Sequence, residues 1–200
     1  MIRDASALQV AKYIAPRMRE WGRTDLHGLG IINHQRNVPP LDRSETPFRD
    51  DLITNAEQQG FGLMTAWDLY KLVRNFLKHD WKPDQVKPLF YRSGWIHPVP
   101  IHYTRIGTVE EFWDKITVVG IRLHDGQLSK GDRIAFTLPI EYEEQDTPEI
   151  QVDRQSVEVA QVGELVGVKT EMTKKQLRKG TVVYRAERRI SACHPGFALT

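Results

Sequence analysis

The segment from Arg105 to Phe136 constrains the fold most, because strand-forming and turn-forming residues alternate along it. β-Branched residues cluster at 106–109 and again at 116–123, and such side chains suit a half-buried pleated surface. Gly126 follows the second cluster and can reverse the chain, since glycine tolerates positive φ. Gly131 marks a further corner before the next apolar run. The segment therefore predicts a series of short strands joined by tight turns.

The same spacing of short strands continues toward the C-terminus. Apolar and β-branched residues recur at 149–152, at 163–169 and at 181–184, with residues 157–160 as a short connecting piece. Glycines inside the 163–169 run allow sharp coiling of the strand. Because closing a sheet on itself removes its unpaired edges, this many short strands favour a small closed barrel over a flat sheet.

Residues 100–187 contain, in order, Ile106-Gly107-x-Val109, Val118 to Ile121, Asp125-Gly126, Leu128-x-x-Gly131-Asp132-x-Ile134, Val157-x-x-Ala160, Gly163-x-x-Val166-Gly167-Val168 and Gly180-x-x-Val183-Tyr184. This order resembles the second domain of elongation factor Tu-type translation GTPases. The resemblance implies a six-stranded Greek-key barrel. In the translation factors this barrel sits beside a GTPase domain, contacts RNA and has no nucleotide site of its own. These 200 residues contain no Gly-x-x-x-x-Gly-Lys-Ser/Thr loop to hold phosphates, so we do not expect GTPase activity.

The first half of the chain has the periodicity of a mixed α/β segment. Residues 6–21 form an amphipathic helical pattern, and the apolar run 28–33 suits a buried strand. A helix is expected to begin at Pro47 and end before Gly60, followed by a strand at 61–64. Thr65-x-x-Asp68 then resembles a capping box that opens another helix. This order predicts a right-handed βαβ crossover in a sheet of only two strands.

The first half also contains Gly30-Ile31-Ile32-Asn33-His34-Gln35-Arg36, Pro39-Pro40-x-x-Arg43 and Gly62-Leu63-Met64-Thr65-x-x-Asp68-Leu69-Tyr70, with Gln9-x-x-x-Tyr13 on the preceding helix. These residues resemble the C-terminal part of nuclease-like domains of the PD-(D/E)XK restriction-endonuclease superfamily. In that superfamily the catalytic Asp and Glu-x-Lys strands come before this helix, and here only a few residues do. The resemblance therefore implies a truncated, fragmentary or degenerate nuclease-like domain.

The predicted fold class is therefore α+β and multidomain. We expect a partial α/β, restriction-endonuclease-like segment over residues 1–80, followed by an all-β, translation-protein-type barrel over residues 101–188. The proline-rich residues 81–100 are expected to be a linker between them. Residues 189–200 are expected to be a tail.

Composition limits the possible partners. Lys and Arg number 28 against 26 Asp and Glu, so the net charge of +2 gives no strong electrostatic case for nucleic acid from the total alone. The single cysteine, Cys193, excludes an internal disulfide and suits a reducing compartment. The sequence has no apolar run long enough to span a bilayer and no secretory leader, so we predict a cytoplasmic protein with no membrane association. The histidines do not have zinc-site spacing, and no metal or cofactor is predicted.

Candidate nucleic-acid-binding residues fall into three groups. Two lie one helical turn apart and face the same way, three lie on the loop that follows the first strand, and three belong to the basic run before the last strand. In that order they are Gln9 and Tyr13; His34, Arg36 and Arg43; and Lys174, Lys175 and Lys179. No catalytic residue is predicted, because no carboxylate set for metal-dependent hydrolysis can be assembled from residues 1–100.

Three functions remain open from the sequence. The first is a noncatalytic nucleic-acid-associated or interaction module whose affinity for DNA or RNA is weak and non-specific. The second is part of a PD-(D/E)XK nuclease whose catalytic residues lie upstream or on another chain. The third is a protein-interaction adaptor without nucleic-acid contact. A protein partner, or a missing N-terminal segment, would cover the exposed sheet of the α/β half.

Overall fold

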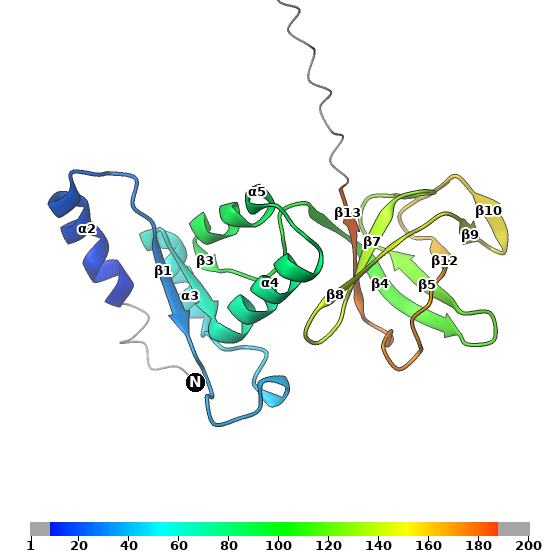
Figure 1. The fold of residues 1–200 in the computed structure, drawn as a ribbon, viewed down its shortest axis with the longest axis horizontal. Helices are drawn as coiled ribbons and strands as arrows, with labels where there is room; N and C mark the ends of the chain where they lie inside the picture. The colour runs from blue at the N-terminus through cyan, green and yellow to red at the C-terminus, as the bar shows by residue number, and fades with distance from the viewer. Residues whose placement is uncertain (1–8, 188–200) are drawn as a thin grey trace, which may run out of the picture. The chain divides into compact units, whose positions relative to one another are not determined.

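The computed structural model describes residues 9–187, which divide into two compact units. Within the described residues, the first unit comprises residues 9–101 and 139–141, and the second comprises residues 102–138 and 142–187. The first unit mixes helices with a small parallel sheet, and the second is built almost entirely of antiparallel strands (Figure 1). The expected α+β class, with an α/β segment followed by a barrel-type β domain, is confirmed.

The first unit alternates helices and strands along the chain. Its elements are α2 (Gln9–Trp21), β1 (Gly28–Ile32), η1 (Pro40–Asp42), α3 (Asp50–Gln59), β2 (Phe61–Thr65), α4 (Ala66–Lys78), α5 (Pro83–Val86), η2 (Lys87–Tyr91) and β3 (Gly94–Trp95). The three strands pair in parallel in the order β1-β2-β3. All five residues of the central strand β2 are buried, which is why its sequence is a continuous short apolar run.

Local signals place the ends of these helices. α3 ends at Gly60, whose φ of 70° lies in the left-handed region that favours glycine. α4 begins behind Thr65, whose hydroxyl accepts a hydrogen bond from the Asp68 amide at 2.9 Å, so the predicted cap is present. α3 begins at Asp50 rather than at Pro47, because Arg49 has extended dihedral angles and forms the N-cap.

Residues 81–100 differ from the expected linker, because they fold onto the first unit. They contain α5, η2 and β3, and β3 adds a third strand beside β2. Leu89 and Ile96 are almost fully buried, and the Ile96 amide donates to the Leu63 carbonyl at 2.8 Å. The prolines keep the helices of this segment short, but the apolar residues between the prolines still pack into the core of the first unit.

The second unit contains ten strands, most of them short. They are β4 (Tyr103–Trp113), β5 (Val118–Leu123), β6 (Leu128–Ser129), β7 (Arg133–Thr137), β8 (Tyr142–Asp146), β9 (Ile150–Val152), β10 (Gln155–Val157), β11 (Val159–Ala160), β12 (Leu165–Lys169) and β13 (Val182–Ala186). Eight form one antiparallel sheet in the order β10-β9-β12-β5-β4-β13-β7-β8, while β6 and β11 form a separate ribbon. Inward side chains form an apolar core that includes Ile106, Ile121, Phe136 and Val166.

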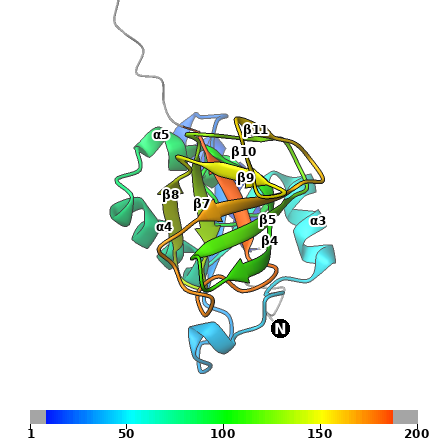
Figure 2. The same cartoon turned by 90° about the vertical axis from the view of Figure 1, so that its right-hand side faces the viewer.

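The sheet of the second unit curls around this core, as Figure 2 shows. Its outer strand β8 approaches β12 through Gln145, whose Nε2 donates to the Lys169 carbonyl at 2.9 Å and whose Oε1 accepts from the Thr170 hydroxyl at 2.6 Å. Side chains, rather than a backbone ladder, therefore join the two sides. The structure differs in this from the expected six-stranded barrel: eight strands share the sheet, and no continuous ladder closes it.

Limited proteolysis should separate the two units. The division between them falls at Ile101 and His102, and the second unit has the larger sheet and an extended buried core. We expect dilute protease to leave a stable fragment that begins near residues 95–105, identified by intact mass and N-terminal sequencing. Survival of an N-terminal fragment together with loss of the β unit would contradict this prediction.

Candidate functional site

The candidate site forms where strand β4 is irregular. Val109 lies opposite Ile121, but the next paired residue of β4 is Glu111, which lies opposite Gly120. Glu110 is therefore an extra residue on β4, which makes this a β-bulge. Bulges bend a strand and re-aim its side chains, and they are common beside functional sites.

The loop before β13 packs beside this bulge and is held at both ends. We define the basic loop as residues 173–181. Within it Leu177 is 1 % exposed and belongs to the core of the unit, and just before it Met172 is also buried. The Thr173 carbonyl accepts hydrogen bonds from the amides of Gln176 and Leu177, both at 3.0 Å, so the chain makes a tight turn there.

The far end of the basic loop is bonded to β4 itself. The Gly180 amide donates to the Val109 carbonyl at 2.8 Å, and the Val109 amide donates to the Thr181 carbonyl at 2.8 Å. Gly180 has a φ of 88°, a conformation that a residue with a side chain rarely adopts. The loop is therefore ordered by backbone bonds and by a buried leucine, while its cationic side chains are exposed.

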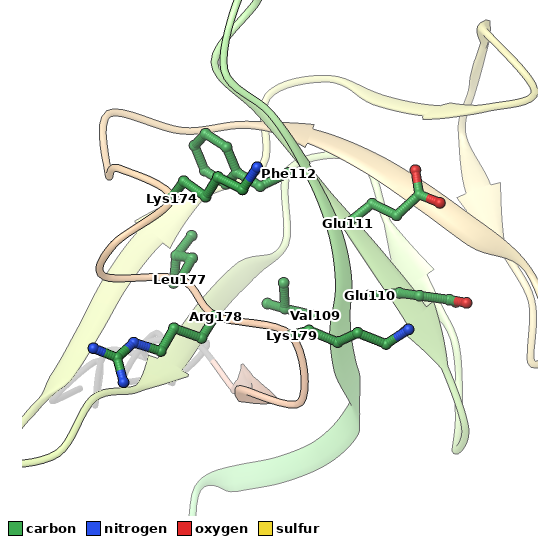
Figure 3. Close-up of a pocket in the computed structure, with 8 residues that line it drawn as sticks. All are labelled: Val109, Glu110, Glu111, Phe112, Lys174, Leu177, Arg178 and Lys179. Atoms are coloured by element: carbon green, nitrogen blue, oxygen red, sulfur yellow. The ribbon is translucent and has the colours of Figure 1, made fainter.

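The bulge and the basic loop enclose an open groove of about 500 Å³, shown in Figure 3. The strand supplies two carboxylates and two apolar side chains, and the loop supplies three cations and the top of the buried leucine. The lining residues are Val109, Glu110, Glu111, Phe112, Lys174, Leu177, Arg178 and Lys179. The groove thus has an apolar floor with charges around it.

The three cations of the groove do not converge on one point. In Figure 3 the side chains of Lys174, Arg178 and Lys179 leave the loop in different directions. The Lys174 ammonium lies 3.7 Å from Asp114 Oδ2, and both side chains are more than half exposed, so water screens this pair strongly. The positive charge is spread along the loop rather than focused on a single small anion.

One carboxylate of the groove already has a partner. Arg122 Nε donates to Glu110 Oε2 at 2.6 Å. This hydrogen bond lowers the pKa of Glu110, burial opposes the shift, and the positive charges of Arg122 and Lys179 lower that pKa further. Glu110 therefore stays ionised at neutral pH, and its charge is matched first by Arg122.

The structure brings part of the predicted basic run to this groove. Lys174 and Lys179 line it, whereas Lys175 is exposed on the same loop outside the lining set. Arg178 lines the groove although the sequence prediction did not include it; its place within the run 174–179 was the available signal. No sequence pattern indicated Glu110 as a site residue, because a bulge depends on pairing with a distant strand.

The predicted residues of the first loop have mostly structural contacts. Arg43 donates from Nε to the Val38 carbonyl at 2.9 Å and from Nη1 to Asn33 Oδ1 at 3.0 Å. His34 is 9 % exposed, and its Nε2 lies 3.2 Å from the Ser44 carbonyl oxygen. Arg36 is exposed. The loop is thus organised by Arg43 and His34, and its binding role stays a prediction.

The remaining two predicted residues lie on α2. Gln9 and Tyr13 are both exposed, and Tyr13 has 60 % of its surface accessible. Their spacing places them one helical turn apart, as expected. They belong to the first unit, while the lysines belong to the second. Their contact with a ligand also stays a prediction.

A second polar cluster occupies the carboxyl end of the parallel sheet. Lys71 Nζ lies 2.9 Å from Asp68 Oδ1, and the other carboxylate oxygen accepts from the Thr65 hydroxyl at 2.7 Å. Burial lowers the pKa of His97, while the charge of Asp68 opposes this shift and that of Lys71 adds to it. These contacts cap α4 and satisfy its first turn.

Two classes of feature were not found in residues 9–187. No three His, Cys, Asp or Glu side chains come together there in an arrangement that could hold a metal ion. Among the described helices, none combines the length and apolar character needed to span a bilayer. Cys193 and the predicted tail lie outside the described residues.

Comparison with known proteins gives only distant structural similarity. No protein-family profile matches the sequence, and no curated protein matches it. The C-terminal domain of a putative U32 peptidase from Geobacillus thermoleovorans aligns over 41 % of this chain and 91 % of its own, with 16 % identity and a TM-score of 0.37.

Two translation factors also align, over most of this chain but under a third of their own. The bacterial selenocysteine-specific elongation factor EF-Sec covers 82 % of this chain and 27 % of its own, with 14 % identity and a TM-score of 0.34. GDP-bound aIF5B from Aeropyrum pernix covers 87 % and 31 %, with 14 % identity and a TM-score of 0.33. At these TM-scores the similarity assigns the chain to no family.

Removing the anchor of the basic loop should destabilise the second unit. Leu177→Ala deletes a fully buried side chain, so we expect the free energy of unfolding to fall by about 2–5 kcal/mol, measured by urea denaturation. Lys175→Ala removes an exposed neighbour on the same loop and should change stability by less than about 0.5 kcal/mol. Equal, small effects of both variants would show that Leu177 does not anchor the loop.

Proposed function

We propose that this chain is a noncatalytic interaction module that associates with nucleic acid through the basic loop. One observation carries the proposal: the buried Leu177 fixes a loop whose cations are exposed, and three of them leave the loop in different directions. The exposed cations are Lys174, Lys175, Arg178 and Lys179, and the three whose directions Figure 3 shows are Lys174, Arg178 and Lys179. Because the loop is ordered already, a ligand need not pay for ordering its backbone.

The spread of the cations favours a polyanion over a single phosphate. A small anion is held best by donors that converge on it, as in a bidentate arginine contact. Here Lys174, Arg178 and Lys179 diverge, and an extended chain of phosphates meets such an arrangement at several points. This supports nucleic-acid backbone as the ligand class.

Sequence-independent binding follows from the same geometry. Base readout needs side chains presented rigidly to the edges of bases, whereas flexible lysines contact phosphates that carry no sequence information. The net charge of the whole chain is only +2, so the long-range attraction is small. We therefore propose weak binding that depends on local charge and weakens with salt.

The groove also lacks the arrangement of a hydrolytic centre. Glu110 is bonded to Arg122 at 2.6 Å, and Figure 3 shows Glu111 pointing in another direction. Metal-assisted phosphodiester hydrolysis needs carboxylates that converge on one cation. The site therefore supports binding rather than catalysis by this part of the chain.

The first unit keeps a second candidate function open. In the described residues β1 pairs with β2 alone, so one side of its backbone is available for another strand. This favours the proposal that the unit is part of a PD-(D/E)XK nuclease whose catalytic residues lie upstream or on another chain. Reading the coding sequence immediately upstream tests it: an in-frame Asp strand followed by Glu-x-Lys would support the nuclease, and their absence would support the noncatalytic module.

Neutralising the basic loop should weaken binding to every nucleic-acid sequence. We would change Lys174, Lys175, Arg178 and Lys179 to alanine together and measure binding of labelled oligonucleotides by fluorescence anisotropy across a salt series. The slope of log affinity against log salt should flatten by about 1 for each phosphate contact removed. A separate Arg36→Ala variant tests whether the first unit contributes.

A charge-matched control makes the result specific. Changing Arg19, Lys82, Lys87 and Lys130, which are exposed elsewhere, lowers the net charge by the same amount and should leave most of the binding intact. Full binding by the basic-loop variant, or a strong preference for one sequence, would overturn the proposed interface. Absence of any salt-sensitive binding by the unchanged chain would favour the protein-interaction adaptor instead.

A further inference from the structure

The outer face of the second unit carries an aromatic side chain over a glycine. Val119 and Ile121 of β5 point into the core. Because successive residues of a strand face opposite sides, Val118 and Gly120 face outward. Directly paired residues share a face, which places Trp113 of β4 and Lys169 of β12 on either side of Val118.

The next row of this face has no side chain at its centre. Gly120 of β5 pairs with Gly167 of β12, and Gly167 pairs in turn with Gln151 of β9. A Cβ built on Gly120 would lie 3.0 Å from Trp113 Cη2, 3.2 Å from Trp113 Cζ3 and 3.3 Å from Leu165 Cδ1. The Trp113 indole therefore lies against the backbone of Gly120, in the space a side chain would occupy.

The position of the indole leaves part of it accessible. Trp113 is 37 % exposed although one side of it packs on the sheet. Covering a strand glycine with an aromatic ring stabilises a sheet, which gives Trp113 a structural role in any case. The exposed part of a ring fixed in this way is also a surface on which another flat ring can stack.

Lysines lie near this ring, together with the carboxylates of Glu111 and Asp114. Lys169 lies two strands away on the same face, across β5, and Lys174 of the basic loop pairs with Asp114, the residue after Trp113. Lys115 is exposed in the same β4–β5 turn. A fixed aromatic ring flanked by lysines is the combination that single-stranded nucleic acid uses, with bases on the ring and phosphates on the cations.

We infer that Trp113 stacks on an unpaired base, so that the ligand of this module is single-stranded nucleic acid rather than duplex. This rests on the proposed function and specifies its ligand. In a duplex both faces of each base are covered by its neighbours, so only an unstacked base offers a free face to the indole. Lys169 and Lys174 then contact the phosphates on either side of that base.

The test uses the full chain and two substitutions of one residue. Trp113→Leu keeps an apolar side chain over Gly120 but removes the ring, and Trp113→Phe keeps a smaller ring. Binding is measured by anisotropy with oligothymidine and oligouridine single strands of about 15 nucleotides and with a hairpin duplex. The two single strands also show whether DNA or RNA is preferred.

We expect the leucine variant to bind both single strands about 5- to 150-fold more weakly, with little change for the duplex. The phenylalanine variant should recover part of the loss. A cooperative urea transition in both variants, even at a lower midpoint, would show that both fold. As an independent readout, single strands should quench tryptophan fluorescence of the unchanged chain more than that of Trp113→Phe, which retains the other four tryptophans.

The outcomes separate this inference from the proposed function. Single-strand binding and quenching that do not depend on Trp113, while the basic-loop variant still loses affinity, would overturn stacking and leave the basic interface in place. An equal loss for single strands and duplex in the leucine variant would also overturn stacking. Absence of salt-sensitive binding by the unchanged chain would instead remove the proposed function.

Discussion

The close contact between β4 and β5 at Gly107 is the constraint on which the second unit depends. A Cβ at Gly107 would lie 2.1 Å from the Arg122 carbonyl oxygen, which is far inside van der Waals contact. Because that oxygen belongs to the backbone of a packed strand, it cannot easily move away. Only a residue without a side chain allows these strands to pair here. β4 lies between β5 and β13 and pairs with both. The close approach at Gly107 therefore fixes the position of the strand on which both neighbours pair.

The two ends of β4 are held by different interactions. At its start, the Tyr103 hydroxyl donates to Glu144, and Arg133 Nε donates to the same carboxylate at 2.6 Å. Burial is the main cause that raises the pKa of Tyr103, and the hydrogen bond to Glu144 raises that pKa further, so the hydroxyl keeps its proton. Toward its end, the bulge at Glu110 replaces regular pairing. The strand is thus held by side-chain hydrogen bonds at its start and is irregular beside the groove.

The sequence predicted most of the longer strands of the second unit because its signals there are local, but it gave no prediction for β8 and took the region of β11 as a connecting piece. Gly126 and Gly131 have positive φ, as their turn assignments required, whereas Gly163, expected inside a strand, has a φ of 90° and lies in a turn before β12. β3 was missed, since prolines flank it and its only reason to be a strand is its pairing with β2. The Glu110 bulge and the seating of Trp113 on Gly120 also depend on distant strands, so no local pattern indicates them.

β13 is the last strand of the described chain, yet it occupies the interior of the sheet, between β4 and β7. During synthesis, therefore, β4 and β7 emerge long before the strand that pairs with both. Until Val182–Ala186 leave the ribosome, each has an unpaired backbone edge. Such pairing between distant segments folds slowly, so the nascent β unit has a period of exposure to aggregation that ends only with its final strand.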